Sequence, residues 1–224
     1  MNLRIISYIP LLGLMIFNSF IVLAIVFYPG GTYHEPKTSG YDFFNNFLSD
    51  LGRTITHGGE INFISAFFFN NAMFISGFLF IIFYIYLPIF FKNNSKLFIY
   101  SVLGSVLGVL GSLSFLLVGI TPSDLYLKEH ILFANNIFYI SFPSALIYSF
   151  VIIKSKDLSN IYGLGYFVFS ITLILYIIIL EFGPNIKSEY GLNVQVTAQK
   201  FIALCFVFST WMLAKGLKKT IELD

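Results

Sequence analysis

The sequence has too few charged residues for a water-soluble protein. Asp, Glu, Lys and Arg together make up 11% of the 224 residues, whereas a soluble domain carries about 25%. Hydrophobic residues account for 57% of the chain, and Phe alone occurs 28 times. A surface exposed to water cannot be built from this composition. We therefore predict one integral membrane domain that spans residues 1–224.

Other scarce features exclude several kinds of site. The single cysteine, Cys205, lies in an apolar stretch, so the chain can form neither an intrachain disulfide nor a cysteine metal site. No HExxH pattern is present, and we predict neither a metal ion nor a cofactor. The formal net charge of +2 is small and no dense basic run accompanies it, so we predict no nucleic-acid partner.

Long apolar runs, by contrast, are abundant. A helix needs about 20 apolar residues to cross the hydrocarbon core of a bilayer, and six runs qualify, so we predict an all-α bundle of six transmembrane helices. The first run is too long for the apolar part of a signal peptide, and we expect it to remain as a helix. The predicted spans are Ile5–Tyr28, Phe63–Phe91, Leu97–Ile120, Ile131–Ile153, Ile161–Leu180 and Phe201–Leu213, the last lengthened by Thr197–Lys200.

The distribution of charge predicts the orientation of these helices. Lys and Arg are enriched in short cytoplasmic loops of membrane proteins. With a cytoplasmic N-terminus, the larger share of the 13 basic residues lies inside, and the inner loops Lys92–Lys96 and Lys154–Asn160 are short. Acidic residues are mostly outside, and so are the three histidines, His34, His57 and His130. We therefore predict that both the N- and the C-terminus are cytoplasmic.

The first outer connection, residues 29–62, is long enough to form a cap. Apolar residues recur at helical spacing in Tyr41–Leu51, and Asn46, Asp50 and Arg53 share the opposite face. We predict a short interfacial helix over Tyr41–Leu51. It lies either in the membrane interface or folded back over the mouth of the bundle, and the second arrangement would direct the polar face inward.

Polar residues near the outer ends of the predicted helices form the candidate site. Amides in the outer half of the spans, among them Asn70 and Asn135, either make hydrogen bonds between helices or form the floor of an outward-facing pocket. No charged residue or histidine lies in the central span of a predicted helix, which argues against ion-coupled transport. The candidate ligand-binding residues are Asp50, Arg53, His57, Asn70, Asn135 and Glu181, and the candidate catalytic residues are Asp124 and His130.

Four of these residues lie near the outer ends of different segments. We predict that Asp50, Arg53, Asp124 and His130 meet at the mouth of one cavity, because unpaired charge near hydrocarbon is costly. A histidine oriented by a carboxylate can act as a general base or bind a metal ion together with it. The plainer alternative is that each histidine is a solvated interface residue beside a helix end.

Small residues recur along the third predicted helix, at Gly104, Gly108 and Gly111. Small residues at three- and four-residue spacing let a second helix approach closely. The partner is either another helix of the same chain or a second copy of the protein, so self-association through these glycines is one prediction that the sequence leaves open.

Several short motifs are typical of a known group of membrane proteins. They are Phe47–Gly52 (FLSDLG), Phe68–Asn70, Val118–Pro122 and His130. In these motifs the chain resembles an uncharacterised family of six-helix integral membrane proteins near the Frag/DRAM/Sfk group. The resemblance covers about the first two-thirds of the chain. It implies a six-helix bundle and no established activity, while the neighbouring group points to lipid-linked roles.

Two classes of function follow from these patterns. In the first, the protein is a non-enzymatic membrane scaffold or sensor whose outer residues brace a folded cap. In the second, an outward-facing polar pocket binds or modifies a lipid or a lipid-linked molecule, with Arg53 against an anionic headgroup. A channel for neutral solutes is a more distant alternative. We favour the scaffold or sensor because no catalytic motif is present, and we expect membrane lipid as a partner.

Overall fold

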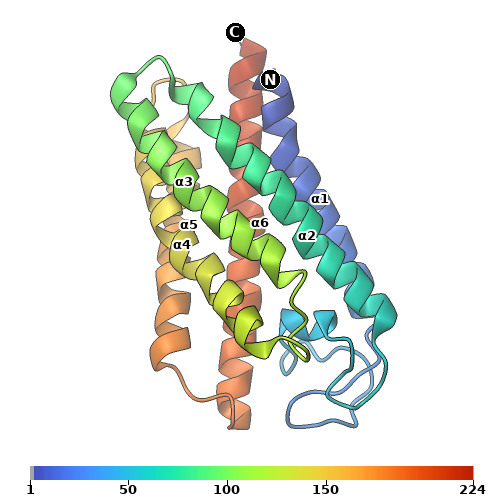
Figure 1. Cartoon of the computed structure of the whole chain (residues 1–224). Helices are drawn as coiled ribbons and strands as arrows, with labels where there is room; N and C mark the ends of the chain where they lie inside the picture. The colour runs from blue at the N-terminus through green and yellow to red at the C-terminus, as the bar shows by residue number, and fades with distance from the viewer. Residues whose placement is uncertain (1–2, 224) are drawn as a thin grey trace.

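Six long α-helices account for most of residues 3–223, the part of the chain that the computed structural model describes (Figure 1). All six are long and apolar enough to cross a membrane, which confirms the predicted all-α bundle. The chain is therefore a multi-pass membrane protein. The elements are α1 (Leu3–Val26), the 3-10 helix η1 (Leu48–Gly52), α2 (Phe63–Tyr86), the 3-10 helix η2 (Leu87–Phe91), α3 (Ser95–Val118), α4 (Leu127–Lys154), α5 (Asn160–Phe182) and α6 (Glu189–Leu223).

The predicted spans agree with these helices in number and order, and they differ mainly at the ends. α2 gives way to η2 at Leu87, because Pro88 has no N–H for the helical hydrogen-bond ladder. α6 begins at Glu189 and is 35 residues long, since its polar ends continue the helix beyond the apolar run Phe201–Leu213. Hydropathy thus locates the part of a helix that crosses the membrane, but not where the helix ends.

The helices close into a ring. Each helix packs against the next one in the chain, and α6 packs against α1. α1 begins and α6 ends at the same end of the bundle, and the connection between α1 and α2 covers the opposite end (Figure 1). We call residues 29–62 of this connection the cap. The ring and its cap together surround the space along the bundle axis.

Glycines of α3 allow close contacts within this ring. Gly104 and Gly111 face α4, and a Cβ added at Gly104 would lie 3.0 Å from the ring of Tyr148. Gly108 faces α2, where an added Cβ would lie 2.4 Å from the ring of Tyr84. These contacts support the interpretation that the small residues pack within one chain. Self-association through the same glycines would require the contacts with α2 and α4 to open.

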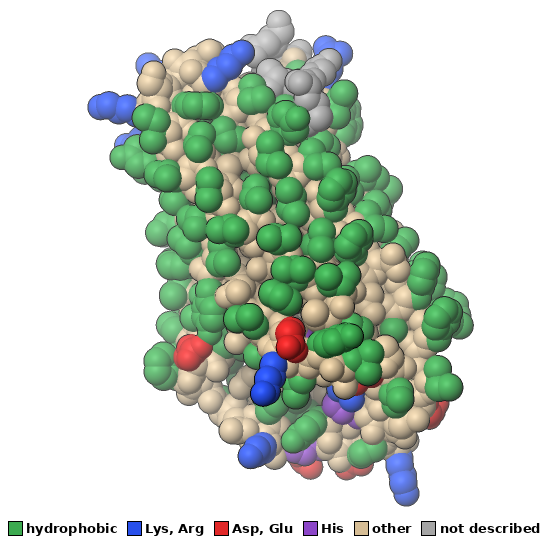
Figure 2. Space-filling model, viewed as in Figure 1, with side chains coloured by type: hydrophobic (Ala, Val, Ile, Leu, Met, Phe, Trp, Pro, Cys, Tyr) green, Lys and Arg blue, Asp and Glu red, His purple; other side chains and the backbone are tan. Residues whose placement is uncertain are grey.

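Charged side chains lie at the two ends of the bundle, with a belt of hydrophobic side chains between them (Figure 2). Basic side chains surround the end at which the chain starts and finishes. Acidic side chains and histidines in the same view lie toward the end that carries the cap. The asymmetry of charge that the sequence predicted is therefore present in the folded chain.

The cap is less helical than the sequence predicted. The expected helix over Tyr41–Leu51 is wrong in extent, because a turn precedes the short helix η1 and only Leu48–Gly52 is helical. The carboxylate of Asp42 accepts hydrogen bonds from the N–H groups of Phe44 (2.9 Å) and Asn45 (3.2 Å). Such bonds between a side chain and the nearby backbone compete with the helical ladder. The cap does fold back over the mouth of the bundle, where η1 contacts α2 and α6.

Candidate ligand-binding cavity and its cap

Asp124, in the connection between α3 and α4, fastens the cap to the bundle. Its carboxylate accepts hydrogen bonds from the N–H of Thr54 (3.0 and 3.1 Å), the hydroxyl of Thr54 (2.5 Å) and the N–H of Ile55 (3.0 Å). Burial pushes the pKa of Asp124 upward, but the hydrogen bonds from Thr54 and Ile55 outweigh it and hold the pKa below its usual range. The carboxylate is thus ionised at neutral pH, and its hydrogen bonds hold the cap at Thr54 and Ile55.

Asp50 organises the interior of the cap. Its buried carboxylate accepts hydrogen bonds from the side-chain amide of Asn46 (3.1 Å) and the N–H of Phe47 (2.9 Å). It also lies 3.2 Å from Nε2 of His57. The amide of Asn46 donates a second bond, to the carbonyl of Gly31 (2.9 Å). These contacts join distant parts of the cap, so the role of Asp50 in this structure is to brace it.

Lys200 joins the cap to α6. Its ammonium group donates a hydrogen bond to the backbone carbonyl of Asn46 (2.7 Å). It also lies 5.4 Å from the ring centre of Tyr41 and 5.0 Å from that of Phe43. Aromatic faces attract a cation at such distances. A buried lysine side chain therefore fastens the cap to the helix that closes the ring.

Amides at the start of α2 hold the far end of η1. The side chain of Asn62 donates to the carbonyls of Leu51 (3.0 Å) and Arg53 (2.8 Å). The amide of Asn70, two helical turns further along, donates to the carbonyl of Gly52 (3.2 Å). A 3-10 helix leaves its last carbonyl groups without partners inside the helix. The amides of α2 satisfy these carbonyls, and they fix the cap against the bundle.

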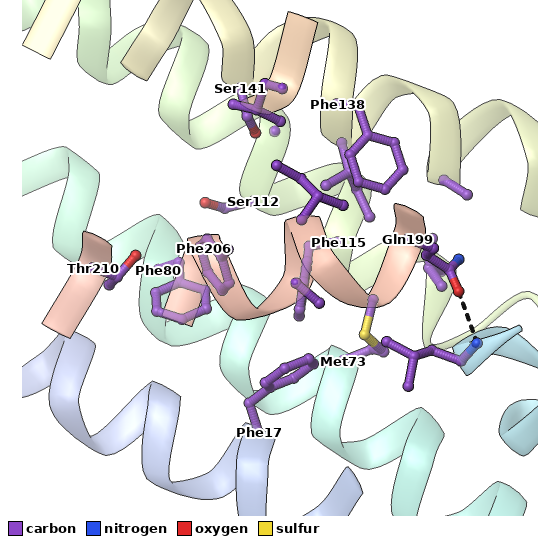
Figure 3. Close-up of a pocket in the computed structure, with 18 of the residues that line it drawn as sticks. Phe17, Met73, Phe80, Ser112, Phe115, Phe138, Ser141, Gln199, Phe206 and Thr210 are labelled. Atoms are coloured by element: carbon purple, nitrogen blue, oxygen red, sulfur yellow. Dashed lines mark hydrogen bonds between the residues drawn. The ribbon is translucent and has the colours of Figure 1, made fainter. Parts of the chain in front are cut away.

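A cavity of about 120 Å³ lies inside the ring, and residues of the cap form part of its lining (Figure 3). Side chains from all six α-helices line it, and Leu48 and Ser49 of η1 line it from the cap. Among the residues that the structure describes, none that lines this cavity is Asp, Glu, Lys or Arg. Its walls are mostly aromatic and aliphatic, as the side chains of Phe17, Phe115 and Phe206 illustrate.

His130, one of the residues that line the cavity, has a buried polar atom without a partner. The side chain is only 5% exposed, and its Nδ1 lies 2.6 Å from the carbonyl oxygen of Thr121. Because a carbonyl oxygen only accepts hydrogen bonds, this contact assigns the ring proton to Nδ1. Nε2 then carries a lone pair, and it has no hydrogen-bond partner within residues 3–223. A buried acceptor without a donor is uncommon and calls for an explanation.

Gln199 of α6 also lines the cavity. Its side-chain oxygen accepts a hydrogen bond from the N–H of Leu48 (2.8 Å), which Figure 3 shows as a dashed line. The oxygen is therefore committed to the cap, and the amide N–H groups of Gln199 remain as donors. The cap and the lining of the cavity meet at this residue.

The structure brings some of the residues that the sequence placed in one site close together, because His57 lies 3.2 Å from Asp50 and the charges of Asp50 and Arg53 act on His130. Of the eight candidates, His130 lines the cavity. The others lie outside its lining: Asp50, Arg53, His57, Asn70, Asp124, Asn135 and Glu181. Arg53 donates from Nε to the carbonyl of Ile55 (3.1 Å) within the cap, and exposed Glu181 accepts a hydrogen bond from the hydroxyl of Tyr139.

The proposed acid–base pair has no support in these contacts. Asp124 is engaged by Thr54 and Ile55, whereas His130 is oriented by the carbonyl of Thr121. Gln199 and Ser49 line the cavity although neither was a candidate. The only signal for Gln199 in the sequence is that it is a polar residue at the outer end of the last apolar run.

Comparisons of the chain with protein-family models, with curated protein sequences and with solved structures find no match. The resemblance of the short motifs to a six-helix membrane protein family therefore stays a prediction. The geometry of the cavity and of its cap is the basis for a function.

Proposed function

We propose that this membrane protein is a non-enzymatic receptor that binds a lipid-like molecule in the cavity beneath its cap. The observation that carries the proposal is the cavity itself, which every membrane helix and the cap line with mostly apolar side chains. Protein interiors are usually packed with few voids larger than a water molecule. Apolar pockets that contain a few well-placed polar groups are typical ligand sites, and a cavity of about 120 Å³ would hold a short segment of one apolar chain and not a whole lipid.

The distribution of acidic groups favours binding over catalysis. The carboxylates of Asp50 and Asp124 accept hydrogen bonds from neighbouring groups of the cap. General acid–base catalysis requires a group within hydrogen-bond reach of the reacting proton. In the lining of the cavity, His130 has no carboxylate beside it that could orient the ring. A binding site therefore accounts for the arrangement better than an active site.

The position of the cap supports a sensing role. Leu48 and Ser49 are part of the lining of the cavity, and the same segment is fastened to α6 through Gln199 and Lys200. A ligand that binds one arrangement of these contacts better than another shifts the population toward that arrangement. Occupation of the cavity would thus be communicated to the cap, the largest segment outside the helices within residues 3–223.

The arrangement of charge supports an orientation with the cap outside. Basic side chains lie at the end of the bundle where the chain starts and finishes, as the positive-inside rule expects of a cytoplasmic face. Reporter fusions test this orientation, one after Lys219 and one within Thr32–Gly40. We expect the first to report the cytoplasm and the second the outside. The reverse result would invert the orientation, and both fusions on one side would contradict the six-helix topology.

Photo-crosslinking tests whether the cavity binds a lipid-like molecule. A fatty alcohol with a diazirine in its chain would be added to membranes that contain the protein and activated by light. We expect crosslinked peptides from several helices that line the cavity. Ala203 lines it, whereas its neighbour Leu204 is 65% exposed on the outer face. Ala203→Phe should therefore abolish the internal crosslinks, and Leu204→Phe should preserve them.

The two variants add aromatic volume at adjacent positions of α6, so they form a matched pair. Equal internal crosslinking in the wild type, in Ala203→Phe and in Leu204→Phe would show that the chain does not occupy the cavity. Crosslinks confined to residues on the outer surface of the bundle would lead to the same conclusion. Either result would favour a scaffold whose cavity is only a packing defect.

A further inference from the structure

We infer that the group bound in the cavity is a single uncharged aromatic ring of about the size of benzene. The inference rests on the proposed function, and it names the chemical class of the group that the cavity holds. Three observations carry it: the volume of the cavity, the aromatic side chains that every helix contributes to its lining, and the lack of ionised groups among the described lining residues.

The volume of the cavity limits the bound group to one ring. The cavity measures about 120 Å³. An apolar cavity of roughly 150 Å³ in another protein stays dry and binds benzene or xenon, so the space available here is of the same order. A group with several fused rings and the full hydrocarbon chain of a membrane lipid are both too large for it. A ring of six carbon atoms therefore matches this volume.

Aromatic side chains line the cavity from every helix of the bundle. Each of the six α-helices contributes at least one Phe to the lining, and these residues include Phe17 (α1), Phe80 (α2), Phe115 (α3), Phe138 (α4), Phe169 (α5) and Phe206 (α6). Several of them are drawn as sticks in Figure 3. A group bound in this space is therefore in contact with aromatic residues that come from different sides of the ring of helices.

These aromatic rings contact one another edge to face. The ring centres of Phe80 and Phe206 are 5.3 Å apart at an interplanar angle of 87°, and those of Phe80 and Phe115 are 6.1 Å apart at 82°. In such a pair the positive edge of one ring lies against the negative face of the other, and this attraction adds to the burial of apolar area. An aromatic ligand group extends the arrangement, whereas an alkyl group of the same size gains only from burial.

The lining disfavours a charged ligand group. Cages of aromatic rings can bind quaternary ammonium groups, because aromatic faces attract cations. Among the described residues that line this cavity, however, none is Asp, Glu, Lys or Arg. A buried charge without a partner of opposite sign is strongly disfavoured. The edge-to-face contacts of Phe80 also occupy aromatic faces that a cation would need. The cavity therefore favours an uncharged ring over a cation or a carboxylate.

Competition among small probes tests the inference. The protein in lipid nanodiscs would be titrated with fluorobenzene, and the bound form would be followed by fluorine NMR with saturation transfer. Benzene, cyclohexane, hexane, naphthalene and tetramethylammonium would then compete, the uncharged probes at equal concentration in the bilayer. We expect benzene to compete best. Cyclohexane and hexane have the same number of carbon atoms, but they lack the edge-to-face attraction and should compete about 5-fold more weakly. Naphthalene and tetramethylammonium should compete least.

Two matched pairs of substitutions locate the bound ring. Ala203→Phe adds volume to the lining and should abolish the saturable fluorobenzene signal, whereas Leu204→Phe on the outer face should preserve it. Phe206→Leu removes one aromatic ring from the lining, and the preference for benzene over cyclohexane should fall to about 2-fold. Phe208→Leu, at a position of the same helix that is 60% exposed, should leave the preference unchanged. Phe115→Leu removes another ring of the lining and replaces Phe206→Leu if that variant fails to fold.

The outcomes separate this inference from the proposed function. Equal competition by benzene, cyclohexane and hexane, with loss of the signal in Ala203→Phe, would keep the cavity as an apolar site and overturn the aromatic ring as its determinant. Preferential binding of tetramethylammonium or of naphthalene would also overturn the inference. So would the lack of a saturable fluorobenzene signal in a protein whose crosslinks to the diazirine alcohol are lost in Ala203→Phe. Unchanged crosslinking in Ala203→Phe would overturn the proposed function itself.

One further probe distinguishes the two sources of such a ring. Hexylbenzene carries the same ring on an apolar chain. If benzene is preferred and hexylbenzene competes equally well, the ring belongs to a lipid whose chain extends out of the cavity. If hexylbenzene competes more weakly than benzene, the ring belongs to a free small molecule.

Discussion

The cap and the cavity differ in how their polar side chains are used. Paired polar groups hold the cap: Asp50 bonds Asn46 within it, while Asp124 bonds Thr54 and Lys200 bonds a carbonyl group of the cap from outside. In the lining of the cavity, apolar side chains are the majority and none of the described residues is Asp, Glu, Lys or Arg. Satisfied polar networks hold a unique structure, whereas a mostly apolar lining leaves the interior of the ring with few such contacts. The concentration of polar residues thus marks the contacts that hold the cap in place.

The largest loss of stability should follow when the hydrogen bonds of Asp50 in the cap are removed. Asp50→Ala leaves the amide of Asn46 and the N–H of Phe47 without their shared acceptor inside the cap. Removing one partner from buried hydrogen bonds to a charged group costs about 3 kcal/mol. We expect the free energy of unfolding in detergent to fall by about that amount. Glu60→Ala, at an exposed position of the same loop, is the matched control and should have little effect.

A smaller loss should follow when the fit of the cap is disturbed. A Cβ added at Gly52 would lie 2.4 Å from the ring of Phe69 and 2.6 Å from Oδ1 of Asn70. Overpacking of this kind costs about 2 kcal/mol, and we expect Gly52→Ala to lower the melting temperature accordingly. Gly165→Ala serves as the control, because an added Cβ would lie 3.4 Å from Sδ of Met212, which is ordinary contact. An unchanged melting temperature in Gly52→Ala would contradict close packing of η1 on α2.

The pH dependence of stability tests the bond between the cap and the connection that follows α3. The folded state holds the pKa of Asp124 below its usual range. Its contribution is therefore fully present above the unfolded pKa of roughly 3.9, and it is lost as the pH falls through the lower folded pKa. Asp124→Asn should destabilise the protein by about 1 kcal/mol at neutral pH, and the difference from the wild type should shrink under acid. A constant difference down to pH values below roughly 3 would contradict this role.

The division between the two regions also explains what the sequence could predict. Apolar runs predicted the number and order of the helices, because length and hydropathy alone decide whether a helix can cross a bilayer. The extent of the cap helix was not predictable in the same way. The carboxylate of Asp42 binds nearby backbone N–H groups, and this competition decides the local structure. The helical spacing of apolar residues in Tyr41–Leu51 gives no information about these hydrogen bonds.

The candidate site was less predictable than the fold. Similar membrane depth placed Asp50, Asp124 and His130 near one another in the prediction, but depth does not tell which group each side chain contacts. The hydrogen bond between Asp124 and Thr54 joins residues 70 positions apart in the chain. The tautomer of His130 depends on a carbonyl of the preceding connection. Both are tertiary contacts that no single stretch of the sequence contains.

The smallest effect on stability should come from a substitution in the lining of the cavity. The same substitution should have a large effect on binding. Ala203→Leu adds volume to a wall that faces open space inside the ring, so the added methyl groups need not displace a packed neighbour. Burial of each added CH₂ group stabilises by about 0.8 kcal/mol at most, and rotamer restriction offsets part of it. We expect the free energy of unfolding to stay within about 1 kcal/mol of the wild type or to rise slightly. Crosslinking by the diazirine alcohol should fall in the same variant. A loss of several kcal/mol, comparable to that of Asp50→Ala, would show instead that this part of α6 is as tightly packed as the cap, and it would contradict the proposed binding site.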